Sequence, residues 1–162
     1  MSTEPICLRP IFSIKAYCAI MMHMMQLTSE QQERLIAWAA AKQVRLCVLF
    51  GSRAMGKARP DSDVDLAVWP KRPFDPLQKL AWIVELETLL DQDVSLVLVS
   101  ADLDPVLGWE IARNGRLLYE QADHLWMHHR AQLWHAYNDS WRFRQAAREQ
   151  LHRFAEEIRR GS

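Results

Sequence analysis

The chain has 162 residues, a length that suits one domain with a moderate core and room for a helical extension. Its 20 basic residues balance its 20 acidic ones, which argues against direct binding of nucleic acid, because dedicated binders carry a basic excess. The three cysteines are odd in number and lack CxxC spacing, which favours a reducing compartment, with the cytoplasm as the default.

The N-terminal segment does not have the properties of a membrane anchor. Residues 11–25 are apolar but too short to span a bilayer, and Lys15 and His23 interrupt them. We therefore expect no membrane association. Because a cluster of methionines precedes the first helix signal, residues 1–26 are interpreted as a poorly ordered leader or an upstream extension.

Helix and strand signals alternate in the next part of the chain. A capping-box pattern at residues 28–32 predicts a helix near residues 29–42. The apolar run at residues 44–50 predicts a buried strand that ends at a Gly-Ser turn, and residues 64–69 predict a second strand closed by Pro70.

Asp75-Pro76 predicts a second long helix that runs to about Asp91. Its spacing places five apolar residues on the inner side: Leu77, Leu80, Ala81, Val84 and Leu89. A third strand at residues 94–99, a short helix at 105–114 and an edge strand at 116–119 follow. This order is typical of an α/β (α+β) fold with a small mixed sheet flanked by helices.

The C-terminal part of the chain predicts a helical tail. Residues 122–158 lack proline and glycine, and we expect a break near Asn138-Asp139. The predicted organisation is a domain at 27–121 and a tail at 122–162. An aromatic series in the tail either packs on the core or forms a docking face for a partner: Trp126, Trp134, Tyr137 and Trp141.

Two motifs in the domain indicate chemistry on a nucleotide. Asp63 and Asp65 are two residues apart on a predicted strand, so both carboxylates project from one face and can hold magnesium. Gly51 lets the backbone approach a phosphate closely, and Ser52 offers a hydroxyl and an amide. Each motif alone is commonly a solvated turn, but the two together, each beside a buried strand, predict transfer of a nucleotidyl group.

Other polar residues carry weaker signals. Lys57 and Arg59 either steer phosphate or are solvating loop charges. His124, His128 and His135 fall along one side of the tail, but no neighbouring cysteine or carboxylate motif supports a metal site there.

The segments Leu49-Phe50-Gly51-Ser52-Arg53-Ala54-Met55-Gly56 and Ser62-Asp63-Val64-Asp65-Leu66-Ala67-Val68 resemble the DNA polymerase β-type nucleotidyltransferase superfamily. Within it, the chain most resembles the minimal nucleotidyltransferases paired with HEPN toxins. The resemblance covers roughly residues 35–119 and extends weakly into the tail.

The resemblance implies roles for individual residues. It implies that Asp63 and Asp65 bind Mg²⁺, and that Gly51, Ser52 and Arg53 lie at the nucleotide. The family has a third carboxylate on the third strand, where this chain has Ser95, and serine is neither a comparable base nor a comparable ligand. Asp93 lies two residues earlier on the same face and is a candidate replacement.

The resemblance also implies a function and a partner. The leading hypothesis is an antitoxin that transfers AMP from ATP to a tyrosine of a cognate HEPN-type RNase toxin, within a hetero-oligomer. A second hypothesis, favoured by Ser95, is an antitoxin that neutralises the toxin by binding alone. A third is a nucleotidyltransferase acting on a small alcohol such as an aminoglycoside, for which the short core leaves little room.

Overall fold

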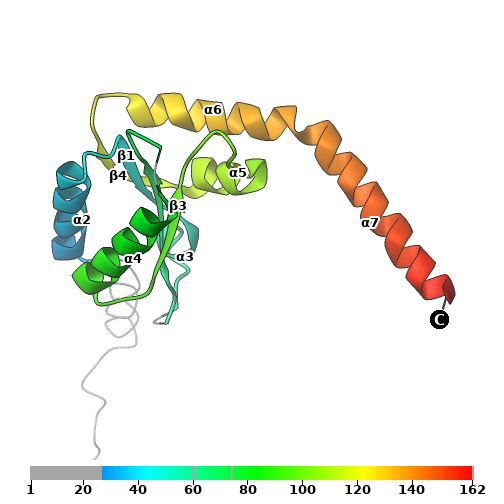
Figure 1. Cartoon of the computed structure of the whole chain (residues 1–162), viewed down its shortest axis with the longest axis horizontal. Helices are drawn as coiled ribbons and strands as arrows, with labels where there is room; N and C mark the ends of the chain where they lie inside the picture. The colour runs from blue at the N-terminus through cyan, green and yellow to red at the C-terminus, as the bar shows by residue number, and fades with distance from the viewer. Residues whose placement is uncertain (1–26, 60, 74, 162) are drawn as a thin grey trace, which may run out of the picture.

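The computed structural model describes residues 27–59, 61–73 and 75–161, so the prediction for residues 1–26 lies outside the described residues. Its centre is a four-stranded mixed sheet in the order β3-β2-β1-β4 (Figure 1). The strands are β1 (Leu46–Leu49), β2 (Val64–Trp69), β3 (Val94–Leu98) and β4 (Arg116–Glu120). β1 is antiparallel to β2 and β4, whereas β2 and β3 are parallel. The predicted α/β (α+β) class and the predicted edge strand are confirmed.

Six helices accompany the sheet in the described part of the chain. They are α2 (Ser29–Ala41), α3 (Gly51–Ala54), α4 (Pro76–Leu90), α5 (Pro105–Asn114), α6 (Leu125–Asp139) and α7 (Trp141–Gly161). Thr28 and Gln31 form the predicted capping box of α2, and Asp75 and Asp104 cap α4 and α5 with their carboxylates. Each of these caps satisfies amides that the first turn of a helix leaves free.

Alternating side chains of the strands build a core on each face of the sheet. On one face, Cys47 and Leu49 pack with the inner sides of α2 and α4. On the other face, Leu46 and Val48 pack with Ile111 of α5 and Trp126 of α6. Cys47 is a buried free thiol, and the other two cysteines lie outside the described residues.

The predicted inner side of α4 is wrong at four of its five positions. Leu77, Leu80, Ala81 and Val84 are exposed, and Leu89 is the member that packs against the core. The residues that α4 buries are Trp82, Leu86 and Leu90. The reason is that α4 is apolar on more than one side, so its spacing alone does not identify the face that meets the sheet.

The predicted helical tail is present, with the break where the sequence indicates it. α6 ends at Asp139 and α7 begins at Trp141. α6 packs along α5, whereas α7 extends away from the domain (Figure 1). No helix within the described ranges is long and apolar enough to cross a membrane.

Candidate active site

The Gly-Ser turn meets the Asp63/Asp65 motif where β1 ends. Leu49 pairs with Leu66, and the amide of Phe50 donates to the carbonyl oxygen of Asp65 at 2.9 Å. Gly51 then adopts a φ of +68°, and a Cβ atom on it would lie 2.0 Å from Oδ2 of Asp65. Glycine is therefore required for two reasons. The left-handed backbone is strained for any residue with a Cβ atom, and that atom would also clash with the carboxylate of Asp65.

The two carboxylates differ in environment. Asp63 is exposed just before β2, whereas Asp65 is half-buried within it, and Val64 between them is fully buried. Burial raises the pKa of Asp65, and the neighbouring charge of Asp63 raises it further. A hydrogen bond from Ser95 and the charge of Arg53 lower the same pKa.

Ser95 occupies the position beside Asp65 on the neighbouring strand. In the parallel pairing of β2 with β3, Ser95 is the register partner of Asp65. Asp93 precedes β3, and its carbonyl oxygen accepts from the amide of Val64 at 2.9 Å while its side chain is exposed. It lines a cavity of about 290 Å³ next to Arg53.

Within the described segments, no group of three His, Cys, Asp or Glu side chains could hold a metal ion. The structure thus brings Asp63 and Asp65 together but does not add Asp93 to them as a third ligand. Asp93 as a substitute base stays a prediction. The same finding gives no support to a metal site among the histidines of the tail.

Arg53 points into the protein and positions the loop that carries the carboxylates. Its side chain is 2% exposed, and its Nε donates to the carbonyl oxygens of Ser62 and Asp63 at 3.1 and 3.2 Å. Its Nη2 also donates to the carbonyl of Ser62. The motif marked Arg53 as important, but the sequence did not show that its partners are these two carbonyls. A direct contact with nucleotide stays a prediction.

The remaining residues of the turn are open to solvent to different degrees. Ser52 is half-buried in α3, and its carbonyl oxygen accepts from the amide of Lys57 at 2.9 Å. Lys57 and Arg59 are exposed, and the amide of Arg59 donates to Oγ of Ser62. A role for Ser52 in holding phosphate stays a prediction, as does steering by the two basic residues.

The donor set suits a hard divalent cation that binds together with phosphate. Asp63 and Asp65 supply oxygen ligands, and the missing side chain of Gly51 lets the carboxylate of Asp65 lie directly against the backbone of the turn. Mg²⁺ takes one or two protein carboxylates and completes its shell with water and substrate phosphates. The residues present therefore fit Mg²⁺ bound with a nucleoside triphosphate.

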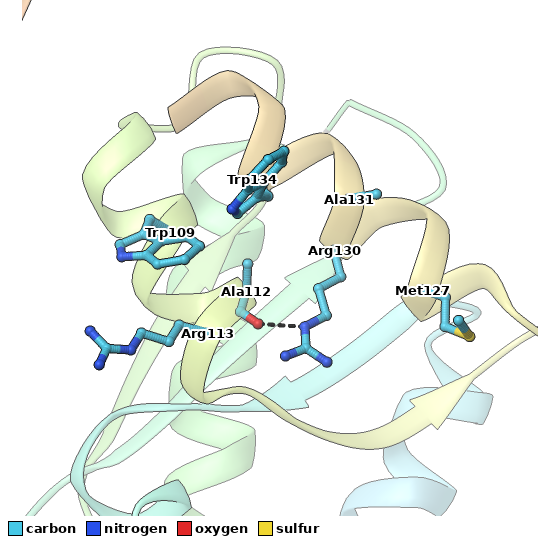
Figure 2. A pocket seen from close by; sticks show the side chains of 7 residues that line it. All are labelled: Trp109, Ala112, Arg113, Met127, Arg130, Ala131 and Trp134. Atoms are coloured by element: carbon cyan, nitrogen blue, oxygen red, sulfur yellow. Dashed lines mark hydrogen bonds between the residues drawn. The ribbon is translucent and has the colours of Figure 1, made fainter. Parts of the chain in front are cut away.

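The aromatic series of the tail is divided between two roles. Trp126 is buried against Trp69, with ring centroids 5.9 Å apart, as expected for a core residue. Trp134 is 47% exposed and borders a groove between α5 and α6 (Figure 2). Tyr137 stacks on Trp109 at 5.1 Å.

This α5–α6 groove has an apolar lining with arginines at its side. It has a volume of about 550 Å³ and is lined by Trp109, Ala112, Arg113, Met127, Arg130, Ala131 and Trp134. The Nε atom of Arg130 donates to the carbonyl oxygen of Ala112 at 2.6 Å (Figure 2). The sequence did not indicate Trp109, Arg113 or Arg130, since they come together only when α6 packs on α5. The groove shares no residue with the carboxylate site.

The mixed sheet places Asp65 of β2 against the glycine turn, with Asp63 directly before the strand, and this arrangement fits the class of nucleotidyltransferases. The family model described as "Polymerase beta, Nucleotidyltransferase" matches residues 33–124, more than half of the chain. The chain belongs to this family. No curated protein matches the sequence.

Solved structures share the fold. A chain of a toxin–antitoxin complex with AMP-PNP has a TM-score of 0.68 and 23% identity, covering 75% of this chain and 98% of that one. A chain of the MntA–HepT toxin–antitoxin has a TM-score of 0.65 and 20% identity, covering 77% and 99%. A chain from the tri-AMPylated Shewanella oneidensis HEPN toxin in complex with MNT antitoxin has a TM-score of 0.63 and 21% identity, covering 75% and 96%.

Proposed function

We propose that this protein is an antitoxin that transfers AMP from ATP to a tyrosine hydroxyl of a HEPN-type RNase toxin. The observation that carries the proposal is the contact between Gly51 and the carboxylate of Asp65, which supports a turn that binds phosphate beside a carboxylate that binds metal. The similar complexes support the choice of donor and acceptor, because one contains AMP-PNP and another an AMPylated HEPN toxin.

In the proposed reaction the tyrosine oxygen attacks the α-phosphorus of ATP, the bond to the β-phosphate breaks, and pyrophosphate leaves. Asp63 and Asp65 would hold Mg²⁺, which would neutralise charge on the triphosphate when bound. The turn at Gly51 and Ser52 binds the outer phosphates. Arg53 positions the loop before β2 through its hydrogen bonds to the carbonyl oxygens of Ser62 and Asp63. Ser95 is a poor base, so the phenolic proton passes to water or to Asp93.

The proposed toxin contact is the α5–α6 groove. Tryptophan, methionine and arginine are enriched at protein interfaces, and the groove combines all three at an exposed surface. Trp134→Ala should weaken the complex by about 2 kcal/mol, roughly a 30-fold rise in Kd, since exposed tryptophans of this kind are frequent hot spots.

The experiment is to incubate the protein and its HEPN-type partner with Mg²⁺ and α-labelled ATP. We expect label on the partner with the native chain and none with Asp63→Ala/Asp65→Ala. Asp61→Ala is the matched control, because it removes an exposed carboxylate two residues before Asp63 and should keep the activity. Label on the partner from the double variant would refute the assignment of the site.

One observation favours a second candidate function, which is neutralisation by binding alone. Ser95 stands in register with Asp65 where the resemblance implies a carboxylate, so chemistry is weakened while the α5–α6 groove is retained. In that case the double aspartate variant would still neutralise the toxin, whereas Trp134→Ala would not. Label on an added aminoglycoside without any protein partner would favour the small-molecule hypothesis instead.

A further inference from the structure

α7 presents an apolar side that the domain does not cover. Phe143, Leu151 and Phe154 are 80%, 67% and 61% exposed, and with Ala147 they fall on one side of the helix. The substantial contacts of α7 are with α6, and the helix extends away from the sheet (Figure 1). A contiguous apolar surface of this kind on a soluble domain marks an interaction site.

The junction between α6 and α7 holds α7 in this direction. Arg144 donates from Nη1 to the carbonyl oxygen of Tyr137 and, at 2.5 Å, to Oγ of Ser140. Its guanidinium also lies 3.6 Å from the centroid of the Tyr137 ring, as in a cation–π contact. These contacts connect the last turn of α6 to the first turn of α7, so α7 is kept from folding back over its own domain.

The outer side of α4 is a second uncovered apolar surface. Leu77, Leu80 and Val84 are 71%, 59% and 61% exposed, and Ala81 and Thr88 continue the same side. This surface runs 11 residues from Leu77 to Thr88, which is about 17 Å at 1.5 Å per residue. The apolar side of α7 runs the same 11 residues, from Phe143 to Phe154. The two surfaces therefore match in length.

The charges beside the two surfaces are opposite. α7 contains six arginines and three glutamates, a net charge of +3, and Arg148 and Arg153 lie on either side of its apolar residues. Residues 75–91 contain four acidic residues and one lysine, a net charge of −3. Glu85 and Glu87 lie on either side of the apolar residues of α4, and Glu85 also pairs with Lys42 of its own chain at 2.7 Å. Each surface thus has the charge that the other requires.

We propose that the protein forms a symmetric dimer in which α7 of each copy lies along α4 of the other. The apolar residues of the two helices meet, and the arginines of α7 face the glutamates of α4. A two-fold arrangement uses both surfaces of both copies and closes, so it does not continue into a filament. This dimer does not depend on the proposed transferase function, and a chain with inactive carboxylates should also form it.

The test is the molar mass of the full chain by light scattering after size exclusion, at tens of micromolar. The native chain should have twice the 18.9 kDa mass of one copy. Leu80→Glu on α4 and Phe154→Glu on α7 should each give monomers, and both positions are exposed, so the fold should remain intact. His152→Glu adds the same charge on the opposite side of α7 and should leave the dimer unchanged.

Mixing the two monomeric variants distinguishes this pairing from other dimers. In the mixture, the native α7 of the Leu80→Glu chain can bind the native α4 of the Phe154→Glu chain, so one of the two contacts returns. We expect a heterodimer that is weaker than the native dimer, so its dissociation constant should be higher. A monomeric native chain, variants that stay dimeric, or a mixture that stays monomeric would each overturn the proposal. Loss of toxin binding by Phe154→Glu in a monomeric protein would assign α7 to the toxin instead.

Discussion

Replacing Gly51 with alanine should damage the site far more than the fold. The new Cβ would lie 2.0 Å from Oδ2 and 2.7 Å from Cγ of Asp65, so the carboxylate must move by about 1.4 Å to reach the 3.4 Å at which ordinary contact begins. A displacement of about 1 Å in a catalytic group lowers a rate by about 100-fold. The left-handed backbone adds a stability cost of about 1–2 kcal/mol, which corresponds to a decrease in Tm of roughly 2–8 °C.

Gly56 provides the matched control for this prediction. Its φ of +69° is within one degree of that of Gly51, but Gly56 is exposed. Gly56→Ala should therefore show a similar loss of stability by thermal unfolding while transfer of label from α-labelled ATP stays near the native rate. If Gly51→Ala retained the activity of Gly56→Ala, the contact between the turn and Asp65 would not matter for the chemistry, and the assignment of the site would fail.

Four further substitutions test the electrostatics around the carboxylates. Ser95→Asp adds a carboxylate in register with Asp65 and should raise Mg²⁺-dependent transfer at least about 10-fold. Ser95→Ala removes a hydrogen bond that lowers the pKa of Asp65, so the acid limb of the pH–activity profile should move to higher pH. Asp65→Asn should abolish transfer but raise the Tm measured in EDTA at pH 7. The reason is that the folded-state pKa of Asp65 is raised, so ionising this carboxyl costs stability as the pH rises through that pKa. The gain in Tm from the substitution should therefore shrink toward pH 4. Arg53→Met leaves the carbonyls of Ser62 and Asp63 without their donor and should cost about 2–3 kcal/mol in urea unfolding.

The sequence predicted the motifs and elements that local chemistry determines. A short apolar run that ends at Gly51-Ser52 is typical of a strand that ends in a tight turn, and the structure has β1 there, followed by the short helix α3. The caps at Thr28 and Asp75 act on amides within three residues of themselves. The contact between Gly51 and Asp65 depends on the antiparallel register of β1 and β2, which no local pattern determines.

The predictions that were wrong or incomplete concern the direction in which side chains face. α4 has apolar residues on two sides, and the side that meets the sheet is chosen by the large inner residues Trp82 and Leu86. Arg53 follows the Gly-Ser motif that is predicted to face a nucleotide, yet its guanidinium turns inward and donates to the carbonyls of Ser62 and Asp63. Both outcomes depend on tertiary neighbours that are distant in sequence.

Ser95 has a physical consequence besides the loss of a possible ligand. The pKa of Asp65 is already raised by burial and by Asp63, so a third carboxylate in the adjacent register position would add more repulsion in the protein without metal. Serine instead donates a hydrogen bond that favours the ionised form of Asp65. The site thus keeps Asp65 in the charged form that binding of the proposed Mg²⁺ would require, with less electrostatic repulsion, and it gives up the strongest base that this position could hold. It follows that Ser95→Asp should gain activity and lose stability together, since both effects come from the same added charge.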